Sequence, residues 1–475
     1  MDEEIQEQEE REPVVISPRG EIKGTVDLWY EDGTLLVEGL ESWDEDLLHY
    51  DDRVSLYRAP AHLYRKILAA LVHAGWAVRD MARDYDEVAL SLVDPPDPYE
   101  HQSGAIEAWK AGGKRGVVIL PTGAGKTFVA QLAIQDVARS ALILVPTIDL
   151  LNQWSGVLEK AFGCTIGLLG GGYHEIEDIT VSTYDSGAIH MDRLGARFGL
   201  LVFDEVHHLP GELYQQIAQS SLAPYRLGLT ATYERADGKH SILDDLVGPV
   251  LFRRSIKELS GDILADYEVR TLAIEMSEDD AETYTKAREE YREFVRIRGI
   301  RMSSVNGWKR FLAETSKSRE GRAAFKAYRL QKQLALVHEK KLEKLYELLE
   351  EHHDDRVLIF TNDNDSVYQI SREVLCPTIT HQTPVKERKE ILARFNEGAY
   401  KTIATSKVLN EGVDVPEARV AVVLSGSGSV REHVQRLGRI LRRAPDKKAL
   451  LYELVTDNSV ETYVSQRRRE HDAYQ

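Results

Sequence analysis

Residues 117–127 read Val-Val-Ile-Leu-Pro-Thr-Gly-Ala-Gly-Lys-Thr, an apolar run followed at once by a glycine-rich turn, a lysine and a threonine. The run is typical of a buried strand, and a helical pattern follows the turn. Glycines let the backbone close around phosphates, and a helix N-terminus offers free N–H groups to anions. We expect Lys126 to reach the β- and γ-phosphates of a nucleotide and the Thr127 hydroxyl to hold Mg²⁺. The predicted phosphate loop consists of Thr122, Gly123, Ala124, Gly125, Lys126 and Thr127.

A pair of carboxylates further along the chain supports this loop, in which Leu120 stands where the usual spacing has a glycine. Asp204 and Glu205 follow the apolar run Leu200–Phe203, where ionised carboxylates are costly unless a cation shares the site. We expect Asp204 to bind Mg²⁺ and Glu205 to orient and deprotonate the attacking water. A helix N-cap pair and a glycine turn without a ligand are the alternatives. Two histidines follow, but no third ligand stands at a spacing suitable for zinc.

Apolar runs alternate with helical segments in two series, which indicates parallel sheets covered on both faces. We therefore expect an α/β chain with two parallel-sheet domains. The runs are Val117–Leu120, Ala141–Val145, Leu200–Phe203 and Arg226–Leu229 in the first series, and Val357–Phe360, Thr402–Ala404, Val420–Leu424 and Ala449–Tyr452 in the second.

The second series is followed by arginines that suit a nucleotide site. Residues 435–442 read Gln-Arg-Leu-Gly-Arg-Ile-Leu-Arg, so Arg439 and Arg442 share one helix face. Two guanidinium groups suit a γ-phosphate whose charge rises in the transition state. We expect them to complete the site from the second domain if ATP binds between the domains. A solvated basic face is the alternative.

The first 97 residues have a different pattern. Two β-like runs, 25–30 and 34–38, flank the turn Glu31-Asp32-Gly33 and predict a hairpin. A helix is expected over His62–Ala74 and a strand near Glu87–Val93, before the stiff proline-rich linker at 94–98. We thus predict a small α+β module at 24–97 after an acidic tail at 1–23, of which 1–12 is expected to be disordered.

Composition excludes several classes of protein. The chain has 475 residues, of which 43% are hydrophobic and 29% charged, as in ordinary folded proteins. No apolar run reaches the length of a membrane span, and the acidic N-terminus differs from a secretory signal. Its two cysteines, Cys164 and Cys376, argue against a disulfide scaffold or a cysteine-based zinc site. We expect a reducing cytoplasm as its location.

The net charge of −18 is unevenly distributed. Residues 1–97 carry −15, whereas the predicted helical stretch at 281–345 carries +9. That stretch interleaves basic residues, Arg310 and Lys326 among them, with aromatic ones. Phosphate neutralisation and base stacking would make it a DNA grip. The alternative is a solvated helical hairpin whose aromatic residues form its core.

The phosphate loop, the carboxylate pair and the arginine helix, in this order, resemble the superfamily 2 helicases over most of residues 98–455. The resemblance implies two RecA-like domains in tandem, 98–280 and 346–475. Further segments that carry it are 98–102, 145–147 with 153–154, 181–184, 229–232, 359–361, 381–383 and 404–416.

This resemblance also implies roles for individual residues. For ATP binding it implies Gln102, Gly412, Asp414 and Gln435 in addition to the phosphate loop. The implied contact of Gln102 with the base differs in its surroundings from the family's, because Asp97 stands where an arginine is frequent. The residues implied for contact with nucleic acid are Thr147, Gln153, Thr183, Thr361 and Thr405. The residues implied for coupling hydrolysis to movement are His207, Thr230, Thr232, Arg235 and Asp237.

Local signatures at 232–238, 425–432 and 435–442 resemble the XPB family of DNA helicases most closely. The resemblance implies a damage-recognition domain at 24–97 and a thumb-like insertion at 281–345. The family's Arg-Glu-Asp triplet, tied to strand separation, reads Arg235-Ala236-Asp237 here. We expect ATP hydrolysis to survive this change, whereas the strength of unwinding is open.

The expected function is that of an ATP-dependent DNA helicase or translocase of 3'-5' polarity, with ATP and Mg²⁺ as cofactors and DNA as partner. A role in repair or transcription implies a further partner, either a nuclease or a repair or transcription factor. The short chain favours a prokaryotic cell, with the protein at the nucleoid. The alternatives are a duplex translocase without strong unwinding, an RNA helicase, and a platform that recruits a nuclease to damaged DNA.

Overall fold

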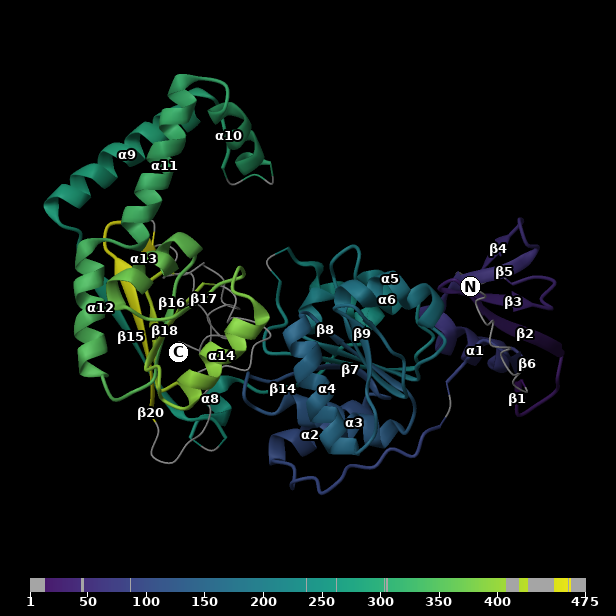
Figure 1. The fold of residues 1–475 in the computed structure, drawn as a ribbon. Helices are drawn as coiled ribbons and strands as arrows, with labels where there is room; N and C mark the ends of the chain where they lie inside the picture. Colours follow the sequence, from purple (N-terminus) through teal and green to yellow (C-terminus); the bar gives the residue numbers. More distant parts are fainter. Residues whose placement is uncertain are drawn as a thin grey trace, which may run out of the picture. The chain divides into compact units, whose positions relative to one another are not determined.

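The structure is a computed structural model, drawn as a ribbon in Figure 1. It forms two compact units, Met1–Leu120 with Gly125–Arg254 and Pro121–Ala124 with Ser255–Gln475. The residues that it describes are 13–43, 47–85, 87–235, 237–261, 263–302, 304, 306–406, 418–425, 448–459 and 461–462.

The N-terminal module of the first unit is a six-stranded sheet covered by one helix. The hairpin is confirmed, since Asp32 and Gly33 adopt the positive φ values of a tight turn between β2 and β3. Helix α1 (Tyr64–His73) buries Ile67 and Leu71 against the sheet. The strand order is β1 (Val14–Ile16), β6 (Trp76–Asp80), β2 (Gly24–Glu31), β3 (Thr34–Glu38), β5 (Leu56–Pro60) and β4 (His49–Asp51).

Two expectations for this module were wrong. The strand expected at Glu87–Val93 does not form; Val88 N–H and Val93 N–H instead donate to the carbonyls of Ala138 and Ala161, at the ends of two helices of the next domain. The strand that pairs with β2 in this sheet is instead β6 (Trp76–Asp80). The sheet also begins before residue 24, because β1 pairs with β6.

The module shares its core with the domain that follows. Ala196 and Leu222 pack into the module's hydrophobic cluster. The Tyr30 hydroxyl lies 2.8 Å from the carbonyl oxygens of both Asp192 and Ser220, and burial raises the pKa of Tyr30. The two parts of this unit are therefore packed as one body.

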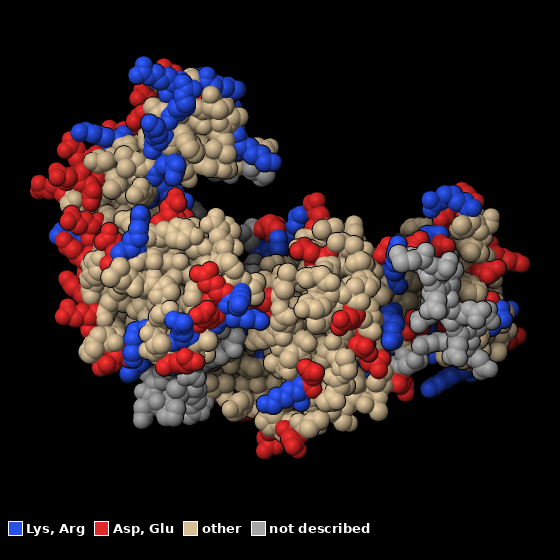
Figure 2. All heavy atoms as spheres, viewed as in Figure 1, with Lys and Arg blue, Asp and Glu red and all other residues tan. Residues whose placement is uncertain are grey.

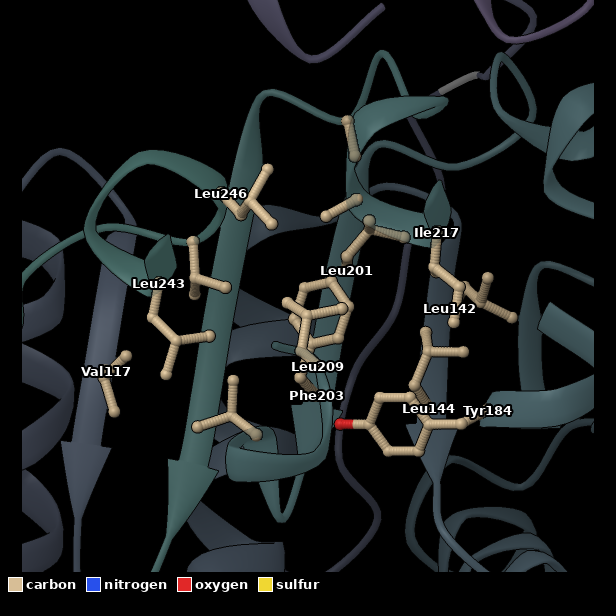
Figure 3. Packing of buried hydrophobic residues seen from close by; sticks show 14 of the residues in the cluster. Val117, Leu142, Leu144, Tyr184, Leu201, Phe203, Leu209, Ile217, Leu243 and Leu246 are labelled. Atoms are coloured by element: carbon tan, nitrogen blue, oxygen red, sulfur yellow. The ribbon is translucent and has the colours of Figure 1, made fainter. Parts of the chain in front are cut away.

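An eight-stranded sheet forms the rest of the first unit, and all its pairings are parallel except that of β10 with β9. The predicted strands at 141–145 and 200–203 are its centre. Figure 3 shows apolar side chains of this sheet packed with Tyr184, Ile217 and Leu246 of α5, α6 and α7. The strand order is β10 (Tyr173–His174), β9 (Gly167–Gly170), β11 (Ile179–Thr183), β8 (Ala141–Val145), β12 (Leu200–Asp204), β13 (Tyr225–Thr230), β7 (Arg115–Ile119) and β14 (Val250–Arg253). The helices are α2 (Glu100–Ala111), α3 (Lys126–Val137), α4 (Ile148–Phe162), α5 (Tyr184–Leu194), α6 (Gln215–Gln219) and α7 (Leu243–Leu246).

The second unit contains another parallel sheet, so the expected α/β fold with two parallel-sheet domains is confirmed. Residues 255–280, expected in the first domain, lie in this unit because β15 pairs with β20 along nine residues. The strand order is β15 (Asp266–Ile274), β20 (Lys448–Thr456), β19 (Val420–Val423), β16 (Val357–Phe360), β18 (Thr402–Thr405) and β17 (Thr378–Ile379). The unit also contains the short helix α8 (Ile256–Leu259) and the longer helices α12 (Glu339–Glu351), α13 (Asn364–Val374) and α14 (Val385–Asn396).

Three helices project from this unit, α9 (Glu278–Ile297), α10 (Gly307–Thr315) and α11 (Arg319–Leu336) (Figure 1). Phe294 and Phe311 are buried between them, with Tyr291 and Tyr328 packed around. Most of the aromatic residues of this thumb therefore form its core. Trp308, which is 41% exposed, remains available to a ligand. Among the helices that the structure describes, none combines the length and apolar character that crossing a bilayer requires.

A buried ion pair anchors the end of α11. The Lys341 ammonium is fully buried; it lies 2.5 Å from a Glu461 carboxylate oxygen and 2.7 Å from the Leu424 carbonyl oxygen. It also donates to the carbonyls of Ala335 and Leu336, the last turn of α11. Lys341 thus joins the thumb to the sheet of its own unit.

Replacing Lys341 by Met should lower the free energy of unfolding by about 3–5 kcal/mol, because it leaves the Glu461 carboxylate buried without a cation. The double change Lys341→Met with Glu461→Leu should recover much of that loss. Urea unfolding of the full chain measures both. The control is Lys340→Met, which removes an exposed pair with Glu343 that water screens and that should contribute little to stability. Equal losses in Lys341→Met and Lys340→Met would contradict the assignment.

Candidate nucleotide-binding site

The phosphate loop connects β7 to α3 and depends on its glycines. Gly123 and Gly125 have φ values of 87° and 80°, which side-chain-bearing residues adopt only at a cost. A Cβ on Gly125 would lie 2.2 Å from Nε2 of Gln102. The loop therefore needs glycine there, and Gln102, expected to contact the base, lies against it.

Lys126 and Thr127 are the first two residues of α3, where backbone N–H groups point out of the helix. The Lys126 ammonium lies 3.3 Å from the Leu120 carbonyl oxygen at the end of β7. This brings the lysine back across its own loop. The predicted loop therefore has both the lysine ammonium and the free N–H groups of a helix N-terminus, the two features that bind phosphate.

Asp204 and Glu205 follow the buried strand β12 directly. Asp204 is only 7% exposed, and its carboxylate accepts hydrogen bonds from the Trp154 indole at 2.9 Å and the Glu205 N–H at 3.1 Å. Burial, with the neighbouring charge of Glu205, raises the pKa of Asp204 to about 6, while Lys126 opposes the rise. A buried carboxylate beside a second, partly buried one is an environment that favours a cation.

The donor set fits Mg²⁺ bound with a nucleotide, since Mg²⁺ prefers oxygen ligands and uses one or two carboxylates together with phosphates. The Asp204 carboxylate and the Thr127 hydroxyl are the residues that would hold it. Bound there, Mg²⁺ would neutralise charge on the β- and γ-phosphate oxygens.

Glu205 stands in a left-handed conformation, φ 49° and ψ 55°, which turns its side chain away from the strand direction. Its carboxylate lies 3.3 Å from the Thr230 hydroxyl and 3.4 Å from Nδ1 of His207. A non-glycine residue held in this conformation is a sign of functional constraint. The geometry suits a base that orients a water molecule.

The residues expected to couple hydrolysis to movement form one network. Nδ1 of His207 lies 3.1 Å from the Thr230 hydroxyl, which also accepts from the Thr232 N–H. Arg235 donates to both carboxylate oxygens of Asp237, and its remaining guanidinium nitrogen donates to the His207 carbonyl. Arg235 therefore joins Asp237 to the segment that carries Glu205.

The residues expected to contact nucleic acid differ among themselves. Thr147 and Thr183 are the N-caps of α4 and α5, and Gln153 is exposed on α4. Thr183 is itself buried, and its hydroxyl is bonded to Ser186, so a contact with DNA there would fall on the helix end and not on this side chain. Thr361 and Thr405 are fully buried, and their hydroxyls donate to the carbonyls of Asp363 and Ile379. The structure therefore argues against side-chain contacts with DNA at Thr361 and Thr405.

Arg310 and Lys326 are both exposed on the thumb. Residues 298–332 hold ten basic and two acidic residues, and Figure 2 shows blue side chains gathered over this part of the thumb. Along α11 the basic positions are Arg319, Arg322, Lys326, Arg329 and Lys332, a spacing of three or four that makes one helix face. Five predicted site residues lie outside the described part of the chain: Gly412, Asp414, Gln435, Arg439 and Arg442.

Sequence reasoning missed two contacts of Asp204. Trp154 donates to its carboxylate, and the Tyr184 hydroxyl lies 3.0 Å from its backbone carbonyl oxygen. Both aromatic residues stand in segments noted only for nucleic-acid contact. Their positions also fit an ordinary core, so the sequence carries no separate signal for these hydrogen bonds.

Three family descriptions match the chain. Residues 28–82 match "Xeroderma pigmentosum group B helicase damage recognition domain", residues 96–235 match "Type III restriction enzyme, res subunit" and residues 340–444 match "Helicase conserved C-terminal domain". All three accord with the order of domains along the chain.

Two relatives match along most of its length. The DNA 3'-5' translocase XPB2 of Sulfurisphaera tokodaii is 39% identical over 424 residues, which cover 89% of this chain and 96% of the relative. The DNA 3'-5' helicase XPB of Mycobacterium tuberculosis is 30% identical over 422 residues, which cover 85% and 69%. The helicase domain of Pyrococcus furiosus Hef is similar in fold, with a TM-score of 0.50 and 19% identity over 78% of this chain and 98% of that one.

Replacing Lys126 by Ala should reduce ATP hydrolysis by at least about 100-fold, because the ammonium opposes the phosphate charge that develops in the transition state. ATP with Mg²⁺ should also no longer raise the melting temperature of the variant, while the ligand-free melting temperature stays that of the wild type. The matched control is Lys160→Ala, an exposed lysine of α4. Near-normal turnover in Lys126→Ala would refute the phosphate-site assignment.

Proposed function

The chain belongs to the XPB/Rad25 family of DNA 3'-5' helicases and translocases, and from this we propose that it is an ATP-dependent DNA motor of 3'-5' polarity. The observation that carries the proposal is the carboxylate pair at the end of β12, the buried Asp204 and the partly buried Glu205, together with Lys126 in the loop after β7. This pair is hydrogen-bonded to the network of His207, Thr230 and Arg235.

In the proposed mechanism Lys126 and the glycine loop bind the phosphates of ATP with Mg²⁺, and Glu205 takes a proton from the attacking water. Thr230 and His207, which contact Glu205, respond to the loss of the γ-phosphate and pass the change to Arg235. We also propose that Arg439 and Arg442 oppose the charge of the transferring phosphoryl group. ADP and phosphate are the products.

The thumb supports a grip on DNA. The exposed basic face of α11 would neutralise backbone phosphates, which gives affinity without sequence preference. The match of residues 28–82 to a damage recognition domain supports a role in repair. A nuclease or a repair or transcription factor as a further partner, and the nucleoid of a prokaryotic cell as the location, are proposals of the same kind.

A duplex translocase that separates strands weakly is the second candidate. It is favoured by Ala236 in the triplet tied to strand separation and by the name of the 39% identical relative, a translocase. The remaining alternatives, an RNA helicase and a passive platform at damaged DNA, differ from both in their response to polymers.

ATP turnover of the pure protein should rise at least about tenfold with DNA and stay at the basal level with RNA. The assay compares duplex, single-stranded and forked DNA with RNA of equal length, and Glu205→Gln serves as the blank. A preference for forked over plain duplex DNA indicates unwinding, and equal stimulation indicates translocation on duplex. Stimulation by RNA alone would overturn the proposal, and no stimulation by any polymer would favour the platform.

The double change Arg322→Ala with Lys326→Ala should weaken DNA binding and flatten its salt dependence. The slope of log K against log salt should fall by about 1.4–1.8, the value for two lost phosphate contacts. Fluorescence anisotropy of labelled DNA at several salt concentrations measures it. Lys340→Ala with Lys344→Ala removes the same charge from α12, where both lysines pair with glutamates, and should leave the slope unchanged. Equal slopes for all three proteins would remove the thumb from the DNA interface.

A further inference from the structure

Asp204 is held by two aromatic side chains that arrive from different helices. The Trp154 indole N–H donates to Oδ2 of Asp204 at 2.9 Å, and the Tyr184 hydroxyl donates to its main-chain oxygen at 3.0 Å. Both rings are buried, with 3% and 1% of their surface exposed. Figure 3 shows the Tyr184 hydroxyl turned toward the strand that carries Leu201 and Phe203.

These aromatic residues lie close to the two helix N-termini expected to face DNA. Trp154 is on α4, whose N-cap is Thr147, and it directly follows the exposed Gln153. Tyr184 is the first residue of α5, whose N-cap is Thr183. Each of the two helices thus provides one aromatic side chain that donates a hydrogen bond to Asp204.

Packing alone does not require these hydrogen bonds. A phenylalanine would fill most of either site, whereas Trp and Tyr add one directed N–H or O–H group. A hydrogen bond weakens steeply when its length or angle departs from the usual range. A small shift of α4 would therefore change how the Asp204 carboxylate is held, and a small shift of α5 would act on the main chain of the same residue.

We infer that Trp154 and Tyr184 are positioning residues that transmit contact with DNA at the N-termini of α4 and α5 to the carboxylate of Asp204. The inference rests on the proposed function, because it needs DNA at these helices and a nucleotide with Mg²⁺ at Asp204. DNA would then strengthen nucleotide binding through the two hydrogen bonds. By linkage, the nucleotide would strengthen DNA binding by the same factor.

The test measures binding in Glu205→Gln protein, which keeps ATP intact. The anisotropy of a fluorescent ATP analogue with Mg²⁺ gives its Kd without DNA and with saturating single-stranded DNA, and the ratio of the two is the coupling factor. Labelled DNA, titrated with and without ATP, gives the reciprocal factor. Trp154→Phe should reduce both factors at least threefold, and Tyr184→Phe should reduce them in the same direction.

Two controls separate positioning from packing. Trp109→Phe removes another buried indole N–H, which donates to the Arg226 carbonyl in the same unit, and should leave the coupling factor unchanged. Tyr64→Phe removes another buried hydroxyl, which donates to Asp80 in the N-terminal module of the same unit, and should also leave it unchanged. Thermal unfolding without ligand reports the loss of packing in every variant.

The outcomes divide clearly. A coupling factor lowered in Trp154→Phe and Tyr184→Phe, and retained in both controls, supports the inference. Wild-type coupling in both variants, or an equal loss in variants and controls, overturns it while leaving the DNA motor intact. A parent protein that binds DNA and ATP without any coupling overturns the inference as well, and one that binds no DNA refutes the proposed function. If Trp154→Phe fails to fold, Tyr184→Phe alone decides.

Discussion

Negative charge at the end of a wholly buried strand is the constraint around which the first helicase domain is arranged. Strand β12 runs through the centre of its sheet with every residue buried, and it ends in two adjacent carboxylates. Burial makes that charge costly, and the Trp154 indole and the Glu205 N–H both donate hydrogen bonds to the Asp204 carboxylate. The Lys126 ammonium, in the glycine loop that follows β7, also opposes this negative charge. The arrangement suits a nucleotide bound together with a divalent cation.

The central strands could be predicted from the sequence because parallel strands buried on both faces have no polar positions, as at Ala141–Val145 and Leu200–Phe203. Strands of the N-terminal module were harder to predict. Trp76–Asp80 contains Arg79 and Asp80 and lacks a clear period, although it pairs on both sides. Glu87–Val93 has the alternation of a strand, but its N–H groups find carbonyls at helix ends instead of a neighbouring strand. An alternating pattern of apolar residues predicts which side chains are buried. It does not predict which carbonyls the backbone N–H groups will bond.

The candidate site shows the same division. Motif spacing identified Lys126, Asp204 and Glu205, because chemistry fixes both residue type and order there. It could not separate Thr147, which caps an exposed helix end, from Thr361, whose hydroxyl is used inside the fold. Nor could it reveal that Trp154 donates to Asp204, since Leu151, Trp154 and Leu158 form an ordinary buried stripe along α4. Hydrogen-bond partners fifty residues apart are set by the packing of whole helices.

The shared core of the N-terminal module and the first helicase domain has a consequence for how the protein is made. The module's sheet and helix leave the ribosome first, yet its hydrophobic cluster includes Ala196 and Leu222. At typical elongation rates the chain needs on the order of 10 s to reach Leu222 after the module has been synthesised. During that interval the apolar cluster of the nascent module lacks Ala196 and Leu222, and part of its surface stays exposed to water. A gene fragment that ends at the linker would leave that surface open permanently.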